Sequence, residues 1–194
     1  MSSFSRIRKE DAILVVIDIQ TRMMPAIYDA ERVIAESAKL IRGCRIMDVP
    51  ILVTQQYTKG LGETVEPILT ALTEDLGGST AATEHRYIEK LRFSAMGDQA
   101  FVSALKNHKK KSVIICGVEG HVCLRQSVLD LMSDGYKVFV ACDCVSSRKE
   151  RDLKPAFVEM SHAGAVLLTS EAILFEMLQS AEDPCFKQIS KLVK

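Results

Sequence analysis

The segment "SVIICGVEGHVCLRQS", residues 112–127, changes character in its middle. It begins with a β-branched run from Val113 to Ile115, which is typical of a strand buried on both faces. Gly117 ends that run, and the residues after Cys123 have the pattern of an amphipathic helix. The segment therefore predicts a strand, a turn and a helix, with a cysteine in the first helical turn. Because a helix N-terminus favours a thiolate, the sequence predicts a depressed pKa for Cys123.

Four more apolar runs resemble this strand, and helical segments separate them. Their continuous pattern is typical of parallel strands that are covered on both faces. The five predicted strands are residues 12–18, 49–56, 111–118, 136–143 and 163–169. Helical apolar stripes occupy residues 31–48, 98–108 and 124–135. Alternating strands and helices imply right-handed crossovers, and so an α/β fold with a mainly parallel central sheet.

Three other segments are less regular. Residues 57–67 contain two glycines and no apolar periodicity, which predicts a loop near the sheet edge. Lys90 is predicted to lie in an irregular segment before the helix at 98–108. Ser147 and Glu150 have the spacing of a capping box, which predicts the start of a further helix.

Length and composition indicate one globular domain that spans residues 1–194. Basic and acidic residues number 25 each, so the net charge is zero and gives no general attraction to nucleic acid or an anionic membrane. The charge run at residues 106–111 is interpreted as a solvated helix end. No apolar run approaches the roughly 20 residues that span a bilayer.

The cysteines and the N-terminus bear on localisation. Six scattered cysteines do not form a disulfide framework, which favours a reducing compartment. The N-terminal residues lack the apolar region of a secretory signal. They are basic and contain serine, as transit peptides do, but only about eleven residues precede the first strand. A cytoplasmic location is therefore predicted, with a mitochondrial one as the alternative.

Three reactive residues follow or lie near predicted strands. In an open parallel sheet, ligands bind beyond the carboxyl ends of the strands. Asp18 ends the first predicted strand and Cys123 follows the third. Taken singly, each residue has an ordinary alternative: Asp18 as a helix N-cap, Cys123 as a small buried hydrophobe and Lys90 as a surface charge. The other five cysteines are assigned to structural positions.

The same three residues belong to motifs that occur in a fixed order. The motifs are "VVIDIQ" (15–20), "KLRFSAMGDQAF" (90–101) and "GVEGHVC" (117–123). Together they resemble the isochorismatase-like cysteine hydrolase superfamily, and within it the eukaryotic isochorismatase domain-containing proteins, over about residues 12–180. The resemblance implies a three-layer α/β/α sandwich and a catalytic triad of Asp18, Lys90 and Cys123.

The resemblance also implies how such a site works. A non-proline cis peptide would join Val118 to Glu119, and the backbone N–H groups of Glu119 and Cys123 would form an oxyanion hole. Asp18 would take the thiol proton, and Lys90 would keep Asp18 charged and oriented. The thiolate would then attack an amide-type carbonyl and form a thioester, which water hydrolyses.

Five residues near these motifs are expected to contact the substrate. They are Gln20, Gln55, Tyr57, Val118 and His121. Nicotinamidase-type members of the superfamily carry an Asp and His metal cluster after the second strand, where this chain has Gln55, Gln56 and Tyr57. Because neutral amides are poor zinc ligands, no metal and no other cofactor is expected.

The sequence therefore predicts a small-molecule hydrolase that cleaves a non-peptide C–N bond through a cysteine thioester. One alternative is a degenerate member that binds a ligand or a partner without turnover. The other is a nucleic-acid-acting protein such as a ribonuclease, which only the basic run at 106–111 and the number of lysines favour. Nucleic-acid and membrane partners are not expected. A homo-oligomer is expected, from the resemblance and because segment 172–178 has more large apolar residues than one covered face needs.

Overall fold

Six parallel strands form one sheet in the computed structural model, which describes residues 6–76 and 85–194. The strands are β1 (Ala12–Ile17), β2 (Ile51–Gln56), β3 (His85–Lys90), β4 (Ser112–Gly117), β5 (Lys137–Val145) and β6 (Val166–Leu168). Their order across the sheet is β3-β2-β1-β4-β5-β6. The first three strands thus lie on one side of the sheet, from β1 at the centre to β3 at the edge. The chain then crosses back, and β4, β5 and β6 follow on the other side of β1, as in doubly wound sheets.

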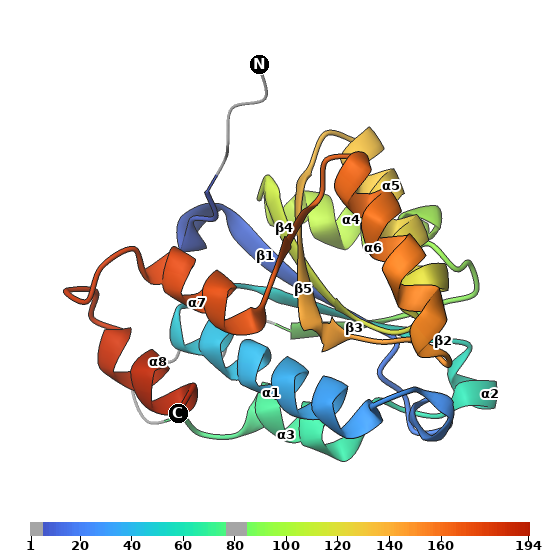
Figure 1. Cartoon of the computed structure of the whole chain (residues 1–194), viewed down its shortest axis with the longest axis horizontal. Coiled ribbons are helices and arrows are strands. Elements are labelled where there is room, and N and C mark those ends of the chain that lie inside the picture. Colours follow the sequence, from blue (N-terminus) through green and yellow to red (C-terminus); the bar gives the residue numbers. More distant parts are fainter. Residues whose placement is uncertain (1–5, 77–84) are drawn as a thin grey trace.

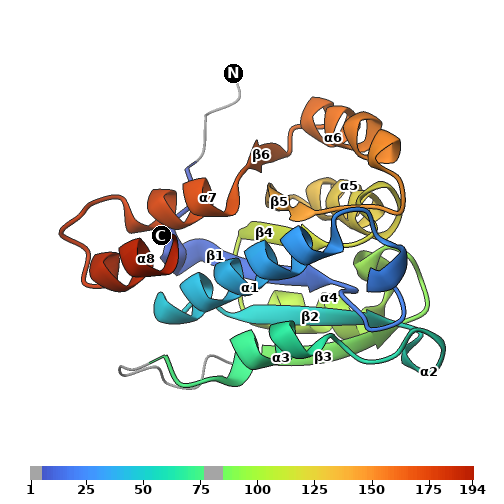
Figure 2. The same cartoon turned by 60° about the horizontal axis from the view of Figure 1, so that its bottom comes forward.

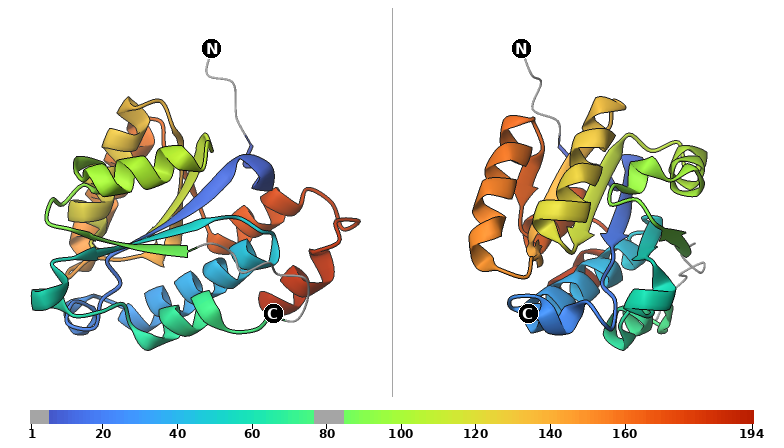
Figure 3. Two further views of the ribbon diagram at one scale, coloured as in Figure 1. Left: turned by 180° about the vertical axis from the view of Figure 1, so that it is seen from behind. Right: turned by 90° about the vertical axis from the view of Figure 1, so that its right-hand side faces the viewer.

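Helices cover both faces of this sheet (Figure 1). They are α1 (Ala30–Ile46), α2 (Thr58–Leu61), α3 (Glu66–Thr73), α4 (Gln99–Asn107), α5 (Arg125–Ser133), α6 (Leu153–His162), α7 (Ser170–Leu178) and α8 (Phe186–Leu192). One layer contains α1, α3, α7 and α8 and the other contains α4, α5 and α6, as Figure 3 also shows from behind. The predicted three-layer α/β/α sandwich with a parallel sheet is confirmed. Within the described residues, a helix suited to spanning a bilayer is not found.

The central strand β1 supplies side chains to two separate cores. Leu14 and Val16 belong to the core that contains α1, whereas Ile13, Val15 and Ile17 belong to the core that contains α4 and α5. All five side chains are fully buried, and burying each contributes about 1.5–3 kcal/mol. Since both faces of β1 need apolar residues, its sequence is a continuous apolar run.

Strand β3 was not predicted from the sequence. It lies at the edge of the sheet, where it pairs with β2. Its last residues alternate, with Ile88 and Lys90 buried and Glu89 exposed, which is the pattern of a half-buried strand. This short polar run lacks the continuous apolar pattern of the central strands. The assignment of Lys90 to an irregular segment is therefore wrong, because Lys90 is the last residue of β3.

Two further local predictions are corrected. Residues 58–61 of the predicted loop form the short helix α2. Ser147 does not cap a helix, because a 3-10 turn at Glu150–Asp152 precedes α6. Ser147 is instead fully buried, and its hydroxyl contacts His121.

The order of connection reverses at β1, which lies between β2 and β4. Open parallel sheets bind ligands at such a point, beyond the carboxyl ends of the strands. In Figure 2 the arrowheads of β1 and β2 point toward the edge that carries α2. Gly117 allows β1 and β4 to approach closely there, because its φ is +118° and an added Cβ atom would lie 2.1 Å from the Ile17 carbonyl oxygen.

Candidate active site

Asp18 is the first residue after β1 and is fully buried. Its φ of +51° turns the chain out of the strand. The carboxylate accepts two hydrogen bonds of 2.6 Å, one from the Thr54 hydroxyl to Oδ1 and one from Lys90 Nζ to Oδ2. The next helical segment begins at Met24, with Met23 as its N-cap. The alternative reading of Asp18 as a helix N-cap is therefore wrong.

Lys90 reaches Asp18 from β3, past the end of β2. The parallel register places Lys90 opposite Gln56, and Nζ donates to Gln56 Oε1 at 2.8 Å. The carbonyl oxygens of Arg92 and Phe93 lie 3.3 and 3.1 Å from the same nitrogen. Lys90 is 1% exposed, and an ammonium group buried this deeply needs such partners. The alternative reading of Lys90 as a surface charge is wrong.

Cys123 lies in the π-helical turn Gly120–Leu124, which leads directly into α5. It is 3% exposed. Burial, followed by the negative charge of Asp18, raises the pKa of the Cys123 thiol to about 12, and the positive charge of Lys90 offsets part of this effect. The predicted depressed pKa is therefore wrong. Loss of solvent and a nearby carboxylate outweigh the helix N-terminus, so the proton rests on the sulfur.

Residues 118–124, here termed the cysteine turn, contain the predicted oxyanion-hole donors. The peptide bond between Val118 and Glu119 is cis, which confirms the geometry that the resemblance implied. The Glu119 carbonyl oxygen accepts hydrogen bonds from later N–H groups of the same turn. Among the described residues, the Glu119 N–H has no acceptor and is available to a ligand. The roles of the Glu119 and Cys123 N–H groups stay predictions.

Gly120 fits the cysteine turn closely against the connection from β5 to α6. Its N–H donates to the Ser146 carbonyl oxygen at 2.8 Å. An added Cβ atom would lie 2.8 Å from Val145 Cγ1 and 3.0 Å from Leu153 Cδ2. A larger residue would therefore require these neighbours to move.

Three buried polar residues of the site were not predicted from the sequence. Ser127 donates to the Cys123 carbonyl oxygen at 2.7 Å and accepts from the Ala95 N–H at 2.9 Å, so it joins the cysteine turn to the loop after β3. The other two are Thr54 and Gln56, which contact Asp18 and Lys90 as described above. In the sequence, Thr54 and Gln56 are marked only as polar residues at the end of an apolar strand. Ser127 is marked only as a polar residue one helical turn after the cysteine.

The side chains of Gln20 and Gln55 make hydrogen bonds within the protein. Gln20 Nε2 donates to the carbonyl oxygens of Gln56 and Gly62, and its Oε1 accepts from the Gln56 N–H. Gln55 Nε2 donates to Glu63 Oε2 at 3.0 Å. Both amides thus hold the segment after β2, and their contact with a substrate stays a prediction. Among the described residues, no three His, Cys, Asp or Glu side chains gather as metal ligands.

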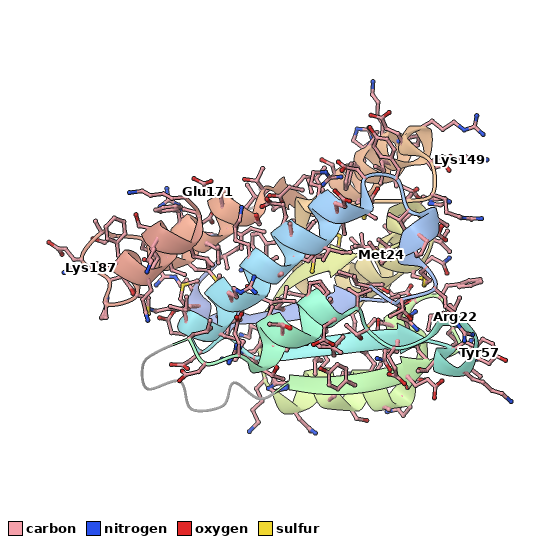
Figure 4. All side chains as sticks on the ribbon, turned by 90° about the horizontal axis from the view of Figure 1, so that it is seen from below. Arg22, Met24, Tyr57, Lys149, Glu171 and Lys187 are labelled. Carbon is pink, nitrogen blue, oxygen red and sulfur yellow. The ribbon has the colours of Figure 1, made fainter. Side chains whose placement is uncertain are left out.

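The other three predicted contact residues differ in exposure. Val118 is fully buried in the core that contains α1, whereas Cys123 belongs to the opposite core. The Val118 side chain therefore packs away from the thiol, and only its main chain can face the site. Tyr57 is 48% exposed and lies near Arg22 at the carboxyl edge of the sheet (Figure 4). His121 is half-buried in the cysteine turn.

A hollow of about 340 Å³ lies beside the end of β3. Its lining residues are Glu89, Lys90, Leu91, Arg92, Gly97 and Asp98. Leu91 and Phe93 of the same loop are 71% and 55% exposed, which is unusual for side chains so apolar. A larger hollow, of about 470 Å³, lies along α6 and includes none of Asp18, Lys90 and Cys123. The smaller hollow includes Lys90 but neither Asp18 nor Cys123.

Two kinds of comparison identify similar proteins. The isochorismatase domain model matches residues 12–172. Isochorismatase domain-containing protein 2A of Mus musculus is 34% identical over 194 residues, which cover 100% of this chain and 87% of that protein. The solved structure of the MAR1 ribonuclease from Caenorhabditis elegans is similar with a TM-score of 0.88 and 36% identity, covering 97% of this chain and 92% of that one.

The YcaC gene product of Escherichia coli, described as an octameric hydrolase of unknown specificity, also has a TM-score of 0.88. It is 23% identical and covers 99% of this chain and 91% of its own, so this likeness shows the fold alone. The family model and the eukaryotic relative carry the assignment, because each matches well over half of the chain. The chain belongs to the isochorismatase domain family, as its three motifs predicted.

Proposed function

We propose that this protein is a cysteine-dependent hydrolase that cleaves an amide-type C–N bond of a small molecule. The observation that carries the proposal is the buried Asp18–Lys90 ion pair, with its atoms 2.6 Å apart, beside the Cys123 thiol. A buried ion pair adds little stability, because desolvation offsets its attraction. A pair of this kind next to a nucleophile, at the ligand-binding edge of the sheet, is better explained by catalysis.

The first half of the proposed reaction forms a thioester. Asp18 takes the proton from the Cys123 sulfur as that sulfur attacks the carbonyl carbon, so the raised thiol pKa does not require a free thiolate beforehand. The N–H groups of Glu119 and Cys123 donate to the oxyanion, each worth a few kcal/mol in such sites. Asp18 then gives its proton to the leaving amine as the C–N bond breaks.

The second half hydrolyses the thioester. Asp18 accepts a proton from water as the water attacks the acyl carbon, and it returns the proton to the sulfur as the C–S bond breaks. Lys90 holds the carboxylate through Oδ2 throughout, while Thr54 holds Oδ1. One carboxylate thereby serves as base and acid in both halves of the reaction.

Leu91, Phe93 and Tyr57 favour a substrate with an apolar group near the scissile bond, because all three expose apolar surface in the segments that follow β2 and β3. A panel of small amides and ureido acids with and without such a group tests the proposal. Mass spectrometry of quenched reactions is expected to find an acyl group on the peptide that contains Cys123. Turnover without that adduct, and undiminished in Cys123→Ala, would rule out the thioester route.

Ribonuclease activity is the second candidate function. It is favoured by the similarity to the MAR1 ribonuclease, at 36% identity over 97% of this chain. The Cys123 thiol lies beside the buried Asp18 carboxylate, a pairing that suits acyl transfer better than cleavage of a phosphodiester. A fluorescently labelled RNA, incubated with wild type and with Cys123→Ala at low and at physiological salt, tests this function directly.

A homo-oligomer is proposed for this chain, as the family resemblance implied. The reason drawn from segment 172–178 is weakened, because Ile173, Leu174, Met177 and Leu178 are buried within the chain. Val158, which lies on the larger hollow along α6, is instead 47% exposed. The surface of α6 is therefore the better candidate for contact with a second copy.

A further inference from the structure

His121 holds the cysteine turn by two contacts to one oxygen. Its ring Nδ1 lies 2.9 Å from Ser147 Oγ, and its main-chain N–H donates to the same oxygen at 3.3 Å. Ser147 is fully buried. Among the described residues, the Ser147 hydroxyl has no other hydrogen-bond partner. The contact between His121 and Ser147 therefore joins the cysteine turn, which follows β4, to the segment that follows β5.

A hydroxyl group carries one proton and can accept two hydrogen bonds, so the direction of its contact with Nδ1 depends on the His121 tautomer. Because the buried Ser147 hydroxyl has no other acceptor among the described residues, donation to Nδ1 is the arrangement that satisfies its proton. In that arrangement the ring proton lies on Nε2. Nε2 faces Asp152 Oδ2 at 3.9 Å, which is too long for a hydrogen bond.

The segment that His121 contacts is itself anchored to a third loop. The Ser147 carbonyl oxygen accepts from the Tyr28 N–H at 2.9 Å, and the Ser146 hydroxyl donates to the Tyr28 carbonyl oxygen at 2.5 Å. The Ser146 carbonyl oxygen also accepts from the Gly120 N–H at 2.8 Å. The loops after β1, β4 and β5 are thus joined in one network. Two cysteine-turn residues contribute side chains to it: His121, which contacts Ser147, and Glu119, whose carboxylate accepts from Arg148 Nε.

We infer that His121 is a positioning residue that aims the N–H groups of the cysteine turn at the oxyanion through its bond with Ser147. The inference rests on the proposed function, because it assigns His121 to the oxyanion hole of that reaction. An apolar side chain at this position would leave the buried Ser147 hydroxyl without an acceptor, which a folded protein avoids by moving the groups involved. The turn between Glu119 and Cys123 is the part that would move.

The chain offers a matched pair of variants. In His121→Asn, the side-chain Oδ1 can occupy the place of Nδ1 and accept from Ser147, whereas His121→Leu has a similar size and no acceptor. Ser147→Ala removes the same bond from the other side. His108→Leu replaces the histidine that ends α4, at the opposite edge of the sheet from the cysteine turn, and serves as the control.

Propanal is a suitable probe, because it does not require a known substrate. The thiol adds across the aldehyde: the S–C bond forms, the C=O π bond breaks, and the thiol proton passes to the oxygen. The oxygen then occupies the place of the oxyanion. Iodoacetamide is the comparison probe, since it displaces iodide from carbon and creates no oxyanion. Protection of the Cys123 peptide from iodoacetamide measures the dissociation constant of propanal, and carbon-13-labelled propanal shows the tetrahedral carbon by NMR.

Wild type is expected to bind propanal at least about 10-fold more tightly than N-acetylcysteine does. His121→Leu and Ser147→Ala should each weaken this binding about 10-fold, and the double variant should lose little more, because both remove one bond. The dissociation constant of propanal for His121→Asn should remain within about 3-fold of the wild-type value. The rate of Cys123 alkylation by iodoacetamide should remain within about 3-fold of wild type in every variant.

The outcomes separate two failures. If wild-type Cys123 binds propanal no better than N-acetylcysteine does, the oxyanion hole of the proposed function is wrong. If wild type binds propanal tightly and Ser147→Ala binds it equally well, the positioning role of His121 is wrong while the proposed function stands. That role is also wrong if His121→Asn binds propanal as weakly as His121→Leu does. Ser147→Ala decides the question even where His121→Leu does not fold.

Discussion

Lys90 Nζ lies 2.6 Å from Asp18 Oδ2, and both side chains are completely shielded from solvent. The two residues belong to strands that are not neighbours, because β2 lies between β3 and β1. The Gln56 side chain at the end of β2 bridges the gap by accepting from the same ammonium group. The ion pair therefore depends on the register of β1, β2 and β3, which places the carboxyl ends of these three strands side by side.

Replacing Lys90 with methionine should destabilise the fold and stop turnover. The substitution keeps most of the side-chain volume but leaves the buried Asp18 carboxylate without its counter-ion, which costs about 3–5 kcal/mol. Urea denaturation followed by circular dichroism measures the loss. In Lys90→Met with Asp18→Asn, most of the stability should return, since no unpaired charge remains. A double variant as unstable as the sum of the single ones would contradict this account.

Asp18→Asn should change the two measurable activities of Cys123 in opposite directions. The Asp18 charge raises the pKa of the thiol, so removing it lowers that pKa and increases the thiolate fraction at pH 8. Alkylation by iodoacetamide should therefore become several-fold faster, about 10-fold for each unit by which the pKa falls. Turnover should fall by about 10²–10⁴, because the general base is lost.

The pH dependence in wild type gives a further check on the thiol. With a pKa of about 12, the alkylation rate of Cys123 should keep rising from pH 7 to pH 11. A plateau near neutral pH would show a thiolate already formed, contrary to the raised pKa. Peptide mapping is needed, since Cys142 and Cys185 are more exposed than Cys123.

Cys123→Ala should abolish acylation on any substrate that the wild type turns over. Cys123 supplies the attacking sulfur in the proposed reaction, and alanine has no group that can replace it. The losses from Asp18→Asn and Cys123→Ala should not add, because the residues act as one unit. Steady-state rates of the two single variants and of the double variant decide this. Cys116→Ala is the control, because Cys116 is buried on the α1 side of the sheet.

Alkaline pH should destabilise the fold through its buried thiols. Burial raises the pKa of Cys116 from 9.0 to about 12. Unfolded chains then ionise this thiol where folded chains do not, so its contribution is complete below about pH 9 and is lost as the pH rises toward 12. Urea midpoints should therefore fall between pH 9 and pH 11, and fall less steeply in Cys116→Ala.

Light scattering at micromolar concentration should give a mass above the 21.5 kDa of one chain. Val158→Glu should dissociate the assembly if α6 forms the contact, because a charge would be buried in an apolar interface. Phe175→Glu tests the surface of α7 in the same way, since Phe175 is partly exposed there and contacts Phe186 edge to face. A measured wild-type mass equal to that of one chain would contradict the predicted homo-oligomer.

The sequence by itself determined the architecture and marked Asp18 and Cys123 as candidate reactive residues. Continuous apolar runs such as residues 12–18 can be satisfied only by strands covered on both faces, and helical stripes between them imply parallel connections. Asp18 stands out because it ends such a run, and Cys123 because it starts a helical pattern a few residues after another. These features are local, so they can be read without knowing what packs against them.

Tertiary structure decided what surrounds these residues, and with it their chemistry. The edge strand β3 has no continuous apolar run, so nothing near Lys90 in the chain shows that its ammonium is buried against Asp18. The pKa of Cys123 depends on burial and on a carboxylate 105 residues earlier in the chain, which reverses the direction that the helix N-terminus alone predicts. Ser147 likewise has the sequence pattern of a helix cap, but in the fold its hydroxyl contacts His121. Burial and electrostatic interactions act through space between distant segments, and therefore only the folded chain defines them.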